Sequence, residues 1–149
     1  MSEVETREVI VEGTPRSHQG GRHGVQQWKE LVIGAATAQL GDETYSIQEV
    51  DVAVQVLQFC PEWGVDGDLD NIAKPILDAL CESHRVLFNN NQVKELLLRR
   101  IEWKRRSISL VENATPRLAA RLDRAVRGEE VGDFVHIWVT TDLSLERLP

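Results

Sequence analysis

The sequence has little of what marks secreted, membrane-spanning or DNA-coating proteins. It has only two cysteines, Cys60 and Cys81, and neither stands in a C-x-x-C pair, so we expect two buried free thiols in a reducing compartment. No apolar run approaches the ~18 residues that a membrane helix needs. The N-terminal segment is polar and mixed in charge, unlike a signal peptide. We therefore expect a cytoplasmic protein that contacts no membrane.

Basic residues are outnumbered by acidic ones, 17 Lys and Arg against 24 Asp and Glu, so the net charge is −7 at pH 7. Indiscriminate binding to nucleic acid is therefore not expected, since affinity for phosphates comes mainly from Lys and Arg. The chain has 149 residues, of which 42% are hydrophobic. This length suits a single domain over residues 1–149 that needs no disulfide or structural metal, with residues 1–4 and 143–149 free to fray.

Hydrophobic periodicity predicts alternating strands and helices. Valines at every second position from Val50 to Val56 indicate a strand, and apolar residues at helical spacing between Val25 and Leu40 indicate a helix that stops at Gly41. The expected strands are 5–12, 49–60, 93–104 and 134–140, and the expected helices are 25–40, 70–83 and 116–127. The order β-α-β-α-β-α-β predicts an α/β (mixed α+β) domain, a mixed sheet of about four strands with helices packed on it.

Three carboxylates alternate where the second strand leads into the second helix. Asp66, Asp68 and Asp70 are two residues apart, so in an extended chain they point the same way and can converge. Converging carboxylates repel one another unless a cation lies between them. Oxygen ligands favour a hard divalent ion, so the pattern predicts Mg²⁺, with Mn²⁺ as a substitute.

These aspartates allow two other interpretations. An EF-hand is excluded, because its sixth position would be Asn71 instead of Gly and its twelfth would be Leu77 instead of Glu. Helix capping is the second, since Asp is favourable at a helix N-terminus. Capping accounts well for one aspartate but hardly for three.

Lys74 and Asp78 follow Asp70 at helical spacings of four and eight, which places the three on one helix face. A lysine there can contact a phosphate oxygen or stabilise charge that develops in phosphoryl transfer. The alternative is an ordinary surface ion pair. Pro75 cannot donate a hydrogen bond to Asn71, so the helix either starts late or is distorted near Asp70.

The stretch from Asp68 to Leu80 resembles the D-x-D-N-x-x-K-x-x-x-D-x-L signature of RusA-type Holliday-junction resolvases. Further along, Asn89-Asn90-Asn91-Gln92-Val93 stands where that family has D-D-x-Q-V, and residues 13–17 with Trp28-Lys29 resemble its first loop and helix. The resemblance implies a Mg²⁺-dependent homodimer that makes paired cuts in four-way junction DNA. It implies Asp68 and Asp70 as metal ligands, Lys74 as an assisting residue and Asp78 as a supporting one.

One position departs from this pattern. The third metal-binding acid of the family corresponds to Asn90, and Asn89 replaces the acid before it. An amide oxygen can bind a hard cation but brings no charge, so metal affinity should fall. Asp66 could supply the missing charge, the protein could be a weakened or inactive junction binder, or the change could be engineered. The asparagines could also simply form a turn and an N-cap.

A basic stretch supplies the charge that a DNA-facing surface needs. Between Arg85 and Arg106 seven basic residues stand against two acids, a net +5 in an acidic protein. The alternative is an edge strand whose charges prevent aggregation. The residues expected to contact DNA are Arg16, Arg22, Lys29, Arg99 and Arg100.

These patterns favour a Mg²⁺-dependent, structure-selective endonuclease that acts on four-way junctions in recombination and repair. Its catalytic residues would be Asp68, Asp70, Lys74 and Asn90, and its metal ligands Asp68, Asp70, Asn90 and Asp66. The first alternative is a junction-binding protein of the same fold with weak or no activity. The second is a metal-free interaction domain whose acids cap helices.

Overall fold

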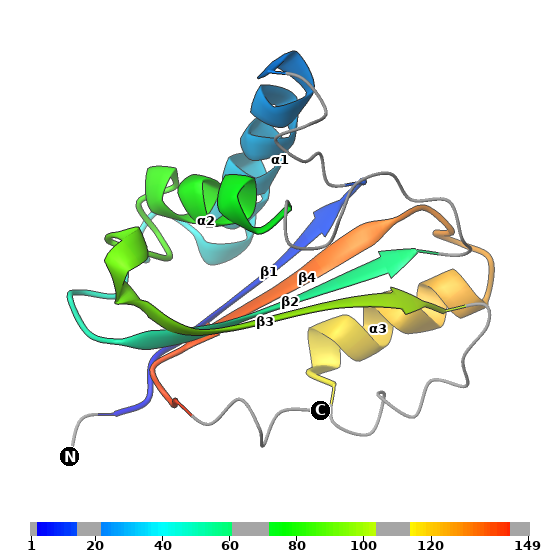
Figure 1. The fold of residues 1–149 in the computed structure, drawn as a ribbon. Helices are drawn as coiled ribbons and strands as arrows, with labels where there is room; N and C mark the ends of the chain where they lie inside the picture. Colours follow the sequence, from blue (N-terminus) through cyan, green and yellow to red (C-terminus); the bar gives the residue numbers. More distant parts are fainter. Residues whose placement is uncertain (1–2, 15–21, 61–71, 104–113, 144–149) are drawn as a thin grey trace.

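The computed structural model describes residues 3–14, 22–60, 72–103 and 114–143, with only the backbone of Arg22. Its centre is a sheet of four strands, in the order β1-β4-β2-β3 (Figure 1). The strands are β1 (Thr6–Glu12), β2 (Val52–Cys60), β3 (Val93–Glu102) and β4 (Phe134–Thr140). β2 and β3 are parallel, and the other two pairs are antiparallel. The mixed α+β fold and its element order are therefore as predicted.

Helices cover both faces of the sheet. α1 (Arg22–Leu40) and α2 (Ala73–Glu82) lie on one face, and α3 (Pro116–Val126) lies on the other (Figure 1). Each face has its own apolar cluster, one with Trp28 of α1 and Ile76 of α2, the other with Leu118 and Leu122 of α3. Because β2 is enclosed on both faces and by strands on both sides, all nine of its residues are buried.

Several element boundaries differ from the sequence prediction, each by one to three residues. β2 begins at Val52 because its pairing with β3 begins there, opposite Val93, and Val50 before it is half exposed. α1 begins at Arg22, three residues before the predicted start. β3 ends at Glu102, inside the predicted range. β4 has the predicted bounds.

Local signals set the starts of the other two helices. α2 begins at Ala73, so Pro75 lies in the first turn, where its missing N–H has no intrahelical partner to lose. Of the two alternatives for Pro75, these bounds agree with a late start, and Asp70 itself lies outside the described residues. α3 begins as predicted, with the Thr115 side chain accepting from the Leu118 N–H at 3.2 Å and Pro116 as the first helical residue.

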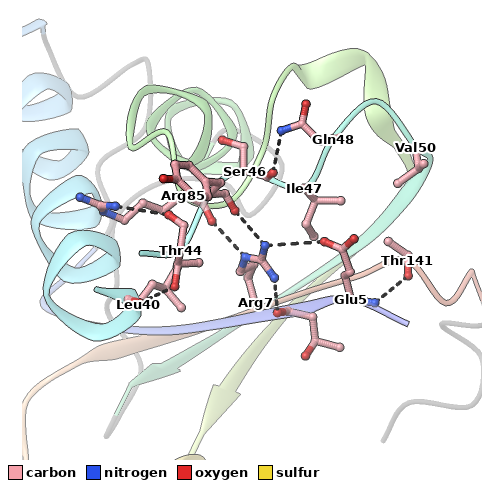
Figure 2. Close-up of polar contacts among 12 residues, drawn as sticks. Glu5, Arg7, Leu40, Thr44, Ser46, Ile47, Gln48, Val50, Arg85 and Thr141 are labelled. Carbon is pink, nitrogen blue, oxygen red and sulfur yellow. Dashed lines mark hydrogen bonds and ion pairs between the residues drawn. The ribbon is translucent and has the colours of Figure 1, made fainter. Parts of the chain in front are cut away.

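Two arginines fasten the connection between α1 and β2. The Arg7 guanidinium donates to the carbonyl of Tyr45 at 2.8 Å and to that of Arg85 at 3.1 Å (Figure 2). Arg85 in turn donates to the carbonyl of Thr44 and to the carboxylate of Asp42. Arg85 belongs to the basic stretch from Arg85 to Arg106, but these bonds give it a structural role.

Candidate metal and DNA-binding site

Three of the predicted site residues meet, although they come from two separate elements. Lys74 and Asp78 lie one turn apart on α2, with Lys74 Nζ 3.3 Å from Asp78 Oδ1. Asn90 begins η3 (Asn90–Gln92), the 3₁₀ turn that precedes β3, and its Nδ2 donates to the same Asp78 oxygen at 2.9 Å. The structure therefore brings the two halves of the sequence motif into contact at Asp78.

A fourth residue, Cys81, completes this cluster. Its Sγ lies 3.0 Å from Asn90 Oδ1. Burial, and then the negative charges of Asp78 and Glu82, raise the pKa of the Cys81 thiol, so the thiol stays protonated and donates. With a donor on one side and a carboxylate on the other, only one orientation of the Asn90 amide satisfies both neighbours. Cys81 is half-buried, whereas Cys60 is buried as expected.

The neighbouring asparagine has a different task. Asn89 Oδ1 accepts from the Asn91 N–H at 2.5 Å, while Gln92 Oε1 accepts from the N–H groups of Phe88 and Asn89. Together these bonds form a capping box around η3. The turn-and-cap interpretation is thus confirmed for Asn89, and Asn90 is left to face α2.

Gln92 is a positioning residue that the sequence did not single out. Its Nε2 donates to the carbonyls of Ile47, Gln48 and Val50, at 3.0, 2.7 and 3.1 Å. The side chain is almost wholly buried. It anchors η3 to the segment before β2 and so sets where Asn90 points. The N-x-x-Q spacing from Asn89 to Gln92, a variant of the capping-box pattern, was the available signal.

The side chains of this cluster provide only some of the ligands that a divalent cation needs. Asp78 and Asn90 offer oxygens, but Asn90 Nδ2 and Lys74 Nζ are both donors aimed at the Asp78 carboxylate. In the part of the chain that the structure describes, no group of three or more His, Cys, Asp or Glu residues could hold a metal ion. The predicted ligands Asp66, Asp68 and Asp70 lie outside the described residues. A complete Mg²⁺ site at this place needs their carboxylates.

The predicted DNA-binding residues do not form one surface. Arg100 Nε donates to Gln58 Oε1 at 3.1 Å, and strand alternation puts it on the same face as Leu98, which packs in the α1/α2 cluster. Arg99 points to the opposite face, where its register partner Leu57 packs under α3. Only Arg100 of this pair therefore lies on the face that α2 covers.

The remaining basic candidates are less informative. Lys29 Nζ pairs with Glu82 Oε2 at 2.7 Å and ties α1 to α2, with its side chain only 17% exposed. Arg16 lies outside the described residues, and the side chain of Arg22 is not described.

We compared the sequence with protein-family models and with curated proteins. No family model matches the chain, and no curated protein matches it either. Among the helices of the described residues, none is long and apolar enough to cross a membrane. The resemblance to RusA-type resolvases thus stays a prediction that rests on the motif residues.

Proposed function

We propose that this chain is a Mg²⁺-dependent endonuclease that resolves four-way DNA junctions as a homodimer in the cytoplasm, in the manner of the RusA-type resolvases that its motif resembles. The contact of Asn90 with Asp78, beside Lys74, carries the proposal. These residues belong to two sequence elements that resemble one active site. Their meeting at one carboxylate is what such a site requires, and it did not follow from the sequence.

Each residue has a part in this proposal. Asp68 and Asp70 would hold the metal, with Asp66 or Asn90 adding an oxygen. A bound Mg²⁺ supplies Lewis acidity towards the scissile phosphate and an activated water. Lys74 is 66% exposed, so its ammonium can exchange the Asp78 carboxylate for a phosphate oxygen at little cost. Asp78 holds both Lys74 and Asn90 in place.

A second candidate is a junction-binding protein of the same fold with little or no cleavage activity. The orientation of the Asn90 amide favours it, because Nδ2 turns a donor towards Asp78 where the family pattern has a third acid. An acid at that position would leave two carboxylates at contact distance, which a cation relieves. The Asn90 amide avoids this repulsion between carboxylates, because it donates a hydrogen bond to Asp78, so the site has less need of a metal.

Incubation of the protein with a labelled synthetic four-way junction, with and without Mg²⁺, tests both candidates. Paired cuts that require Mg²⁺ and disappear in Asp70→Asn support the nuclease. Asp123→Asn is the matched control: this exposed carboxylate on α3 pairs with Arg127 four residues on, the spacing that separates Asp70 from Lys74 in the sequence, and its loss should leave the cuts unchanged. Selective junction binding without cuts supports the second candidate. Absence of both overturns the proposal in favour of a metal-free interaction domain.

A further inference from the structure

The two edge strands of the sheet, β1 and β3, differ in how their outer backbone groups are hydrogen-bonded. On the β1 edge, the Gln39 side chain occupies both the N–H and the carbonyl of Ile10, at 2.9 and 2.6 Å, and Arg117 reaches the carbonyl of Glu8. On the β3 edge, no hydrogen bond within the described part of the chain reaches the backbone of residues 94–99 from any element but β2. An open edge of this kind is a template for another strand.

The side chains of β3 also favour contact with another chain, because they include an exposed leucine and a carboxylate oxygen without a hydrogen-bond partner in the described residues. Three leucines, 96 to 98, stand in a row, and Leu96 is 42% exposed. One carboxylate oxygen of Glu95, Oε1, is removed from water and has no hydrogen-bond partner in the described part of the chain. A carboxylate oxygen in that position is costly unless a donor reaches it. Arg99 lies on the same face of the strand. Residues four apart on one strand are too distant to pair, but Arg99 of an adjacent antiparallel copy could supply this donor.

We propose that β3 pairs with β3 of a second copy of this chain, antiparallel and with Leu97 at the two-fold axis, to form one continuous sheet. A homodimer belongs to the proposed function, but this surface and register follow from β3 alone and can be tested without DNA.

The order of residues along β3 selects this register. Two identical strands related by a two-fold axis pair with one residue opposite its own copy. With Leu97 at the axis, Glu95 lies opposite the partner's Arg99 on the α3 face, and Leu96 lies opposite the partner's Leu98 on the other face. Cross-strand pairs of opposite charge and of apolar residues are both stabilising.

The neighbouring registers are worse. With Leu98 at the axis, Leu96 and Leu97 would face Arg100 and Arg99. With Leu96 at the axis, Leu97 would face Glu95, and Leu98 would face Lys94. The Leu97 register has one kind of unfavourable pair, Lys94 opposite the partner's Arg100, which occurs twice by symmetry. In each copy Arg100 donates to Gln58 of its own chain, which holds it back from this pair.

Sedimentation velocity over a range of concentrations tests the interface. The chain should sediment at twice its mass of 16.8 kDa at tens of micromolar. Glu95→Arg and Arg99→Glu should each weaken dimerisation about tenfold or more, because each replaces two attractive pairs with two repulsive ones. The double variant should restore it, which loss of folding would not. A monomer at every concentration, or a double variant as weak as the single ones, would overturn the proposal.

Two further variants test the register. In the Leu97 register, Lys94→Glu should strengthen the dimer, since the variant replaces repulsion from the partner's Arg100 with attraction. In the Leu98 register the new glutamate would face the partner's Glu102, and the variant would weaken the dimer. Leu97→Cys should give a disulfide-linked dimer on oxidation, because residues at the axis lie about 4.5–5.5 Å apart between Cα atoms. Leu96→Cys, the matched control, should not exceed the wild-type background. Crosslinking of Leu96→Cys in preference to Leu97→Cys would contradict this register.

Discussion

The two faces of the sheet use their charges for different purposes. Under α3, Arg121 is buried and its donors are taken by Glu12 and by the carbonyls of Glu130 and Gly132. On α2, Lys74 and Asp78 are not among the buried residues and remain partly open to solvent. Charges enclosed by the protein stabilise the fold, whereas charges left at the surface remain available to a ligand. We therefore expect stability and function to respond to substitutions on opposite faces.

The largest expected effect on stability comes from Arg121. Its side chain is 1% exposed and stacks over the ring of Phe134 at 4.1 Å, in addition to its hydrogen bonds. Arg121→Ala should lower the free energy of unfolding by about 3 kcal/mol, because it removes these bonds and leaves a cavity. Urea unfolding measures this loss. Arg124→Ala, which breaks an exposed ion pair on the same helix, should cost under about 1 kcal/mol.

The second expected effect concerns Glu8, which joins β1 to β4 and α3. Burial alone would raise its pKa, but hydrogen bonds from His136 and Thr115, together with charge interactions with His136 and Arg117, lower the pKa below its ordinary value of 4.5. The stabilisation from Glu8 is therefore complete above pH 4.5 and is lost as the pH falls through the lower, folded-state pKa. Glu8→Gln should flatten the acid side of the stability curve. An unchanged dependence on pH below 4.5 would contradict this role.

A smaller effect is expected at Thr115, the N-cap of α3. Thr115→Ala removes the acceptor for the Leu118 N–H and the donor to Glu8, and should cost about 1 kcal/mol. Thr115→Ser keeps the hydroxyl and should retain most of that stability. If the two variants unfold at the same urea concentration, the hydroxyl contributes nothing.

The smallest effect on stability should come from Lys74. Its ion pair with Asp78 is exposed, so Lys74→Gln should change the free energy of unfolding by less than about 0.5 kcal/mol. Under the proposed function the same variant should cut or bind junction DNA markedly less well. A loss of stability larger than that of Thr115→Ala would place Lys74 with the structural residues.

The sequence predicted what local signals determine. β4 and the start of α3 follow from alternation and from the Thr115-Pro116 pair, and they agree with the structure. The start of β2 was wrong, because alternation at Val50 continues past the point where β3 supplies a partner.

The sequence predicted which residues belong to the site but not the contacts between them. That Asn90 would reach Asp78 depends on the crossover through α2, which no local pattern reveals. It also depends on Gln92, whose N-x-x-Q spacing from Asn89 signals a cap but not the bonds to the segment before β2. Pairing of Lys29 with Glu82 depends in the same way on how α1 packs against α2. That Arg99 and Arg100 point to opposite faces was, by contrast, available from strand alternation alone.

The most direct test of the central claim compares Asn90→Asp with Asn89→Asp. Both add one negative charge, one residue apart, and Asp serves as well as Asn in capping η3. Titration calorimetry with Mg²⁺, alongside junction cleavage, should show tighter Mg²⁺ binding and faster cleavage for Asn90→Asp and no change for Asn89→Asp. Without metal, Asn90→Asp should be the less stable variant, because its carboxylate meets Asp78 where the amide donated at 2.9 Å. Equal Mg²⁺ affinity in the two variants would contradict the assignment of Asn90 to the metal site.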